Sequence, residues 1–93
     1  MEFEWDETKR LTNLAKHGIH FEDAVRVFFD PLETTMPART VDGEARLKTI
    51  GRFGPEAILV VIHTSRQTVG KSTIIRIIFA RPASRRERLL YER

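Results

Sequence analysis

The sequence has no cysteine, three histidines and no long apolar run. Without cysteine, a disulfide framework, a thiolate nucleophile and a cysteine-based zinc site are excluded. His17, His20 and His63 lack the spacing of a helical metal site, so we predict no metal and no cofactor. The most apolar stretches, residues 57–62 and 74–80, are too short to span a bilayer, and the acidic, aromatic start does not resemble a secretory signal. We therefore expect a cytoplasmic protein with no membrane segment.

Basic residues are concentrated in the last third of the chain. Residues 61–93 contain eight Lys or Arg and two acidic residues, whereas residues 1–60 contain eight and eleven. The local formal charges are therefore +6 (eight minus two) and −3 (eight minus eleven). Arginine stays charged at physiological pH, and its planar set of donors suits phosphate. This asymmetry indicates a polyanionic partner, most commonly nucleic acid; the alternative is a solvated basic surface without a partner.

The N-terminal third is predicted to form a short strand followed by two helices. Aromatic residues alternate with glutamates over residues 2–5, as in a half-buried strand. Asp6 is a suitable N-cap and Gly18 a suitable left-handed stop, so we expect a helix over residues 6–17. Apolar residues spaced i, i+3, i+4 and i+7 predict a second helix over residues 21–28.

The rest of the chain is predicted to form strands and a final short helix. Ser84-x-x-Glu87 has the form of a capping box, which opens a helix with Leu89 and Leu90 facing inward. The order β-α-α-β-β-β-β-α implies an α+β fold, in which a small, mostly antiparallel sheet packs on two N-terminal helices. No repeat or linker is visible, so residues 1–93 are expected to form one domain. The four predicted strands cover residues 33–39, which Pro37 marks as an edge, and residues 45–53, 57–64 and 74–80.

Arg76 is the most informative single residue, because it interrupts an otherwise apolar strand. By strict alternation its side chain would share a face with Ile74, Ile78 and Ala80. A buried guanidinium without a partner is unfavourable. Arg76 therefore either forms a structural ion pair, for example with Glu44 or Asp42, or lies in a cleft where it can bind a phosphate. The sequence alone leaves both interpretations open.

Other arginines are expected near this strand. Arg81 lies at its exit, and Arg66 follows the strand before it. Arg85 and Arg86 occupy the first positions of the last helix, where free N–H groups and arginines would form an anion site. The alternative is that Arg85 and Arg86 point outward and only aid solubility. His63, beside an apolar strand, is interpreted as structural, with a general base as the less common alternative.

Several residues fall in a specific order along the whole chain, and in this arrangement the sequence resembles the BrnT family. These are the toxins of BrnT/BrnA type II toxin–antitoxin pairs. The residues that carry the resemblance are Phe3-x-Trp5-Asp6-x-x-Lys9, Asn13-x-x-Lys16-His17-Gly18-Ile19-x-Phe21-x-x-Ala24, Asp30-Pro31, Gly43-Glu44-x-Arg46, Ile50-Gly51, Thr64-x-Arg66, Arg76-Ile77-Ile78-x-Ala80-Arg81 and Glu87-Arg88-x-x-Tyr91.

The resemblance implies a RelE-like fold and a ribonuclease that inhibits translation. It also implies neutralisation by a BrnA-type antitoxin with a ribbon-helix-helix region, so that the toxin forms a hetero-oligomer and meets DNA only through its partner. RNA can be cleaved without a metal when its own 2′-hydroxyl attacks the adjacent phosphate, and preorganised arginines would stabilise the charge that develops.

These expectations assign roles to named residues. We predict that Arg66, Arg76 and Arg81 contact the reacting phosphate and that Tyr91 stacks on a base or transfers a proton. Core packing is the more ordinary alternative for Tyr91. The RNA backbone would be held by Lys9, Lys16, Arg85 and Arg86. His17 is interpreted first as structural, at the end of a helix, with proton transfer as the alternative. The alternative is a non-catalytic module that binds nucleic acid or the antitoxin through the same basic surface.

Overall fold

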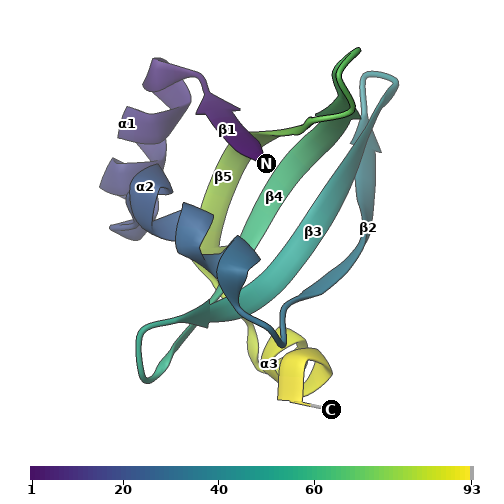
Figure 1. Ribbon diagram of the computed structural model, residues 1–93. Helices are drawn as coiled ribbons and strands as arrows, with labels where there is room; N and C mark the ends of the chain where they lie inside the picture. Colours follow the sequence, from purple (N-terminus) through teal and green to yellow (C-terminus); the bar gives the residue numbers. More distant parts are fainter. Residues whose placement is uncertain (93) are drawn as a thin grey trace.

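A five-stranded mixed sheet forms the centre of the computed structural model, which describes residues 1–92 (Figure 1). The strand order is β1-β5-β4-β3-β2; strands β2 to β5 form an antiparallel meander, and β1 lies parallel to β5. The predicted α+β fold and order of elements are confirmed. The strands are β1 (Glu2–Trp5), β2 (Thr34–Val41), β3 (Glu44–Phe53), β4 (Ala57–Gln67) and β5 (Thr73–Pro82).

The first helix, α1 (Glu7–His17), has the predicted N-cap and C-cap and begins one residue after the predicted start. The Asp6 carboxylate accepts a hydrogen bond from the backbone N–H of Lys9 at 3.0 Å, which satisfies a free donor of the first turn. Gly18 adopts φ +69°, and its N–H donates to the Leu14 carbonyl. Within residues 1–92, no helix is long and apolar enough to cross a membrane.

The predicted second helix is only partly α-helical. One turn, α2 (Phe21–Ala24), continues as a 3₁₀ helix, η1 (Val25–Phe29). Its fully buried side chains, Phe21, Ala24 and Val27, recur every three residues, which is the period of a 3₁₀ helix. The β-branched and aromatic residues of η1 also have low α-helical propensity, so the tighter helix is favoured where packing demands it.

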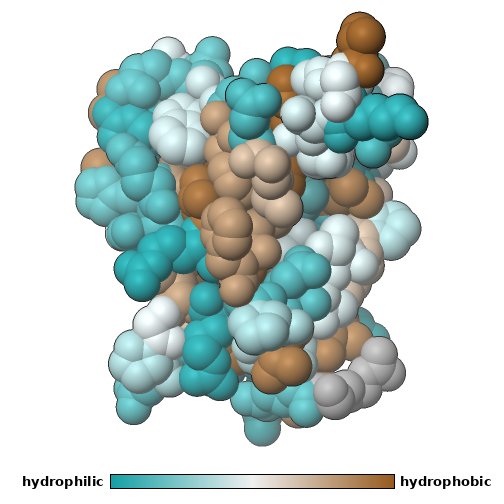
Figure 2. All heavy atoms as spheres, in the orientation of Figure 1, coloured by the Kyte–Doolittle hydropathy of each residue, from teal (hydrophilic) through white to brown (hydrophobic). Residues whose placement is uncertain are grey.

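The two faces of the sheet are covered by different helices. The face that we call the helical face carries Leu59, Val61, Ile75, Ile77 and Ala80, which pack against α2 and η1. Figure 1 shows α2 and η1 in front of this face and α1 to the left, beside β1 and β5, and Figure 2 shows an apolar area over its centre, where η1 crosses the sheet. The opposite face, which we call the open face, is covered at one end by α3 (Arg85–Glu92).

A β-bulge at Ile78 decides which side chains of β5 reach the open face. His63 pairs with Ile77 and Ile62 pairs with Phe79, so Ile78 is an extra residue in β5. Strict alternation placed Ala80 on the same face as Arg76. This prediction is wrong, because the alternation of β5 shifts by one residue at Ile78. Ala80 packs in the core of the helical face, whereas Phe79 lies opposite Ile62 of the open-face core. Because of this extra residue, the side chain of Arg81 points to the same face of the sheet as that of Arg76.

Asn13 of α1 fastens this helix to the sheet. Its side chain is buried; Oδ1 accepts from the Ala80 N–H at 3.0 Å and Nδ2 donates to the Ile19 carbonyl at 3.1 Å. β1 pairs with β5 only as far as Ile77, so Ala80 lies beyond the pairing with that strand. The amide of Asn13 satisfies this free donor and holds α1 beside β5.

The capping box that opens α3 is confirmed. Ser84 Oγ accepts from the Glu87 N–H at 3.2 Å, and Glu87 Oε1 accepts from the Ser84 N–H at 2.8 Å. The prediction that Leu89 faces inward is wrong, because this side chain is 62% exposed. The buried positions of α3 are Glu87 and Tyr91, four residues apart on one helical face, with Leu90 partly buried beside them.

Glu87 joins α3 to the sheet through buried ion pairs. Its carboxylate accepts two hydrogen bonds from Arg81, at 2.7 and 2.8 Å, and one from Lys48 at 3.0 Å. These donors, led by Arg81, hold the pKa of Glu87 far below its ordinary value. Because Glu87 is only 7% exposed, its negative charge depends on these partners.

We predict that Gly51→Ala destabilises the protein by about 1–3 kcal/mol through overpacking. An added Cβ would lie 2.6 Å from Cγ1 of Val27 and 3.0 Å from its carbonyl oxygen, so β3 could no longer approach η1. Gly70→Ala is the matched control, since its nearest neighbour would be Thr68 Oγ1 at 4.0 Å. Urea denaturation of both variants is the measurement; equal stabilities would contradict the close packing of β3 on η1.

We also predict that Glu87→Gln lowers stability at neutral pH by about 1–3 kcal/mol, the usual effect of losing a buried charged partner. The folded pKa of Glu87 lies below its ordinary value of 4.5. Its contribution is therefore complete above that pH and is lost as the pH falls through the lower folded pKa.

Urea denaturation of wild type and Glu87→Gln between pH 7 and pH 3 measures this contribution. The difference in stability should be constant above about pH 4.5 and should narrow below it. Glu92→Gln, an exposed position on the same helix, is the control. A difference that stays constant down to pH 3, or that grows on acidification, would rule out the charge of Glu87 as its origin.

Candidate functional site

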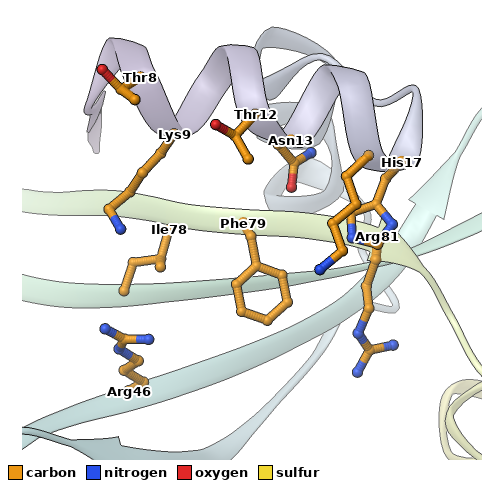
Figure 3. Close-up of a pocket in the computed structure, with 10 residues that line it drawn as sticks. Thr8, Lys9, Thr12, Asn13, His17, Arg46, Ile78, Phe79 and Arg81 are labelled. Carbon is orange, nitrogen blue, oxygen red and sulfur yellow. The ribbon is translucent and has the colours of Figure 1, made fainter.

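Two adjoining hollows on the open face form one groove, which lies between α1 on one side and β2 and β3 on the other. The hollow beside α1 has a volume of about 620 Å³ and the one beside β2 about 460 Å³. Arg46 of β3 and Phe79 and Arg81 of β5 line both hollows. Figure 3 shows these three side chains projecting from the sheet below α1.

The groove is strongly basic. Six Lys or Arg side chains line it, and none of its lining residues among residues 1–92 is acidic. Two carboxylates outside the lining partly offset these cations: Glu87 pairs with Arg81 and Lys48, and Glu44 lies 3.7 Å from Arg46. A concave surface lined by charge of one sign concentrates counter-ions, here anions such as phosphate. The six cations are Lys9 and Lys16 from α1, Arg39 from β2, Arg46 and Lys48 from β3, and Arg81 from β5.

Arg46 holds the central position, and reasoning from the sequence did not select it. It lines both hollows and also a third one, of about 170 Å³, that adjoins them. Its Nε is buried and has no hydrogen-bond partner within residues 1–92; Glu44 Oε1 lies 3.7 Å away. A signal was present in the sequence, because Arg46 and Lys48 occupy alternate positions of one strand and so point to one face.

Arg81 is held in a fixed orientation. Both of its terminal nitrogens donate to Glu87, and this paired hydrogen bonding raises the pKa of the guanidinium further above its ordinary value. The side chain still lines the groove, so its remaining surface faces the space between α1 and β3. Glu87 therefore fixes the orientation of the Arg81 guanidinium in the groove.

Arg76 combines the two interpretations that the sequence left open. Its Nη2 donates to Glu44 at 2.6 Å, the ion pair that was predicted as the structural alternative. The same side chain is 45% exposed and lines the third hollow together with Lys9 and Arg46. Arg76 thus lies beside the basic groove, in a hollow that Asp6 also lines, and Glu44 partly neutralises it.

Arg66 and Tyr91 are not brought into the groove. Arg66 is 60% exposed and pairs with Glu4 across β5, because β1 runs along the far side of that strand. Tyr91 is buried in the core of the open face, and its hydroxyl donates to Asp30 at 2.5 Å. Burial, together with this hydrogen bond, raises the pKa of Tyr91 and favours a structural role.

The cations predicted to hold a backbone divide into two groups. Lys9 and Lys16 lie seven residues apart, two turns of α1, so both face the groove, and His17 lines it beside them. Arg85 and Arg86 are exposed on the first turn of α3 and line neither of the two hollows. The charge of α1, rather than that of α3, completes the groove.

His63 lies within the fold and does not reach the groove. Its ring packs edge-on against Phe28 of η1, with centroids 4.9 Å apart, and Nε2 shares a hydrogen bond of 2.8 Å with the Thr49 hydroxyl. Burial lowers the pKa of His63, so the neutral imidazole is favoured. The structural interpretation of this residue agrees with its position.

The chain is similar to a known family over most of its length. The sequence model of the ribonuclease toxin BrnT of type II toxin–antitoxin systems matches residues 5–87. The 1.1 Å crystal structure of the Brucella abortus ribonuclease toxin BrnT is 35% identical, with a TM-score of 0.63, and the similarity covers 91% of this chain and 99% of that one. No curated protein sequence matches the chain. The resemblance found in the sequence is confirmed, and this chain belongs to the BrnT family of ribonuclease toxins of type II toxin–antitoxin systems.

Proposed function

We propose that the basic groove binds the sugar–phosphate backbone of RNA and cleaves it without a metal, with the neighbouring 2′-hydroxyl as nucleophile. The observation that carries this proposal is the convergence of six cations from one helix and three strands on a concave surface without a lining carboxylate, within the residues described. Membership of a ribonuclease toxin family supports RNA as the polyanion. Loss of messenger RNA would then stop translation.

Arg46 and Arg81 are the proposed ligands of the reacting phosphate. Glu87 fixes Arg81, so this guanidinium needs little reorganisation when charge develops on the phosphate. Arg46 lines both hollows, which places its guanidinium at the centre of the groove. Arg76 would contact a more distant phosphate, in the adjoining third hollow, by exchanging Glu44 for it. Arginine suits all three positions because its planar donors match two phosphate oxygens at once.

Lys9 and Lys16 would guide the RNA backbone along α1. Both are exposed on the wall of the groove. Each contact with a phosphate releases a counter-ion, so binding should weaken as the salt concentration rises. These contacts carry no base specificity, because phosphates are the same at every nucleotide.

His17 is the proposed group for proton transfer. Among the groove residues described, it is the one imidazole, and it lies at the end of α1 next to Lys16. Imidazole gives and takes protons near neutral pH, whereas the guanidinium groups around it stay charged. This role replaces the structural role expected for His17 from its place at a helix end.

Membership of a type II toxin family implies a cognate antitoxin, and we infer that it is of the BrnA type. Such a partner would neutralise the toxin most directly by covering the basic groove, which has no acidic lining residue of its own among residues 1–92. The complex would be a cytoplasmic hetero-oligomer that meets DNA only through the antitoxin.

Arg46→Ala and Arg81→Ala should each lower the rate of RNA cleavage about 10²–10³-fold, the usual effect of losing one preorganised donor to developing charge. The measurement is single-turnover cleavage of a labelled RNA by purified protein, with EDTA present throughout. Arg88→Ala removes an exposed arginine of α3 that does not line the groove and is the matched control.

Three outcomes would contradict this assignment. RNA that stays intact with wild type but is bound tightly at low salt would favour the non-catalytic module. Cleavage that EDTA abolishes would contradict the metal-independent mechanism. Equal rates for Arg46→Ala and Arg88→Ala would place the reaction outside the groove.

His17→Gln should lower the same cleavage rate about 10²–10⁴-fold, because it removes the proton-transfer group and keeps a polar side chain of similar size. Affinity for an uncleavable 2′-O-methyl RNA should change little, since His17 is assigned to chemistry and not to holding the backbone. A rate equal to that of wild type, in a variant with an unchanged melting temperature, would return His17 to a structural role.

A further inference from the structure

Phe79 is the aromatic residue of the groove. Its side chain lines both hollows, between the cations of α1 and those of β2 and β3. In Figure 3 the ring projects from β5 into the space below α1, with Arg46 on one side and Arg81 on the other. The bulge at Ile78 places it there, because without the extra residue Phe79 would point to the helical face.

The ring of Phe79 lacks the kind of partner that the other phenylalanines have. Five of the six phenylalanines lie against an aromatic ring or a guanidinium within the chain; among residues 1–92, Phe79 has no such neighbour. It packs at the border of the open-face core and stays partly exposed. The partnered rings are those of Phe3, Phe21, Phe28, Phe29 and Phe53.

We propose that Phe79 is a stacking platform for one unpaired base of the bound RNA. This proposal rests on the proposed function, in which the groove holds the RNA backbone. Aromatic side chains interleaved with cations are how proteins bind single strands: the ring stacks on a base while the cations hold the phosphates on either side. Arg46 and Arg81 flank Phe79 in the way this arrangement requires.

The substrate class follows from the chemistry of stacking. In a double-stranded RNA each base is already paired and stacked on its neighbours, so none is free to lie on an outside ring. A base can lie on Phe79 only where it is unpaired, as in a single strand or a loop. Stacking depends on the π-face that every base has, so the platform selects unpaired RNA without selecting a particular base.

A purely structural role for Phe79 makes a different prediction. If the ring only covered Ile62 and Ile78 at the edge of the core, leucine would replace it with little effect on RNA. Tyrosine would keep the π-face. The pair Phe79→Leu and Phe79→Tyr therefore separates stacking from apolar packing, and a melting temperature for each variant shows that the fold is kept.

The experiment measures binding of a fluorescein-labelled, single-stranded 2′-O-methyl oligonucleotide by fluorescence anisotropy. This RNA cannot be cleaved, because its attacking hydroxyl is blocked. Phe79→Leu should bind about 5- to 150-fold more weakly than wild type, and Phe79→Tyr within about threefold of it. Phe29→Leu, an exposed ring on η1 outside the groove, is the matched control and should bind as wild type does.

Two further readouts separate stacking from loss of charge or of structure. The slope of log affinity against log salt should stay the same in Phe79→Leu, because no phosphate contact is lost, whereas Lys16→Gln should make it shallower by about 0.7. Duplex 2′-O-methyl RNA of the same sequence should bind more weakly than the single strand and should be insensitive to Phe79→Leu.

Single-strand affinity of Phe79→Leu equal to that of wild type would overturn the proposal, as would an equal loss for single strand and duplex. These results are independent of the cleavage assay. If wild type cleaves RNA and Phe79→Leu binds normally, the base platform alone is wrong. If wild type leaves RNA intact but Phe79→Leu loses single-strand binding, the cleavage mechanism is wrong and the platform stands.

Discussion

The register of β5 against β4 is the constraint on which the groove depends. The bulge at Ile78 lets Ile77 and Ala80 both pack under the helices, while Phe79 and Arg81 reach the opposite face. Without the extra residue, Arg81 would face the apolar core of the helical face, where a guanidinium has no partner. Bulges often re-aim side chains beside functional sites, and this one lies at the centre of the basic groove.

A buried carboxylate makes the basic groove compatible with a stable fold. Glu87 receives hydrogen bonds from Arg81 and Lys48 behind the groove, and it caps the helix that covers the remaining open face. It thereby offsets repulsion between neighbouring cations and orients them. A hydrogen bond from the Tyr91 hydroxyl to Asp30 also joins this helix to the end of η1. Residues of α3 therefore contribute both to the stability of the fold and to the geometry of the groove.

The order of elements could be predicted because each element has local signals, such as Asp6 and Gly18 around α1 or Ser84 and Glu87 at α3. The composition of the groove could not. A bulge leaves no mark in an apolar strand, so the faces of Phe79 and Arg81 were not predictable by alternation. Arg66 and Arg76 were expected to act together, but their partners Glu4 and Glu44 come from strands distant in sequence. Arg46 was missed although it alternates with Lys48, because its central position in the groove depends on how α1 packs beside the sheet.

The central claim is that RNA occupies the groove between α1, β3 and β5. The most direct measurement is a titration of ¹⁵N-labelled protein with single-stranded 2′-O-methyl RNA, followed by amide NMR. The account predicts shifts that concentrate at Lys9, Lys16, Arg46, Phe79 and Arg81 and spare the first turn of α3. Shifts confined to Arg85, Arg86 and the hairpin between β4 and β5 would contradict it.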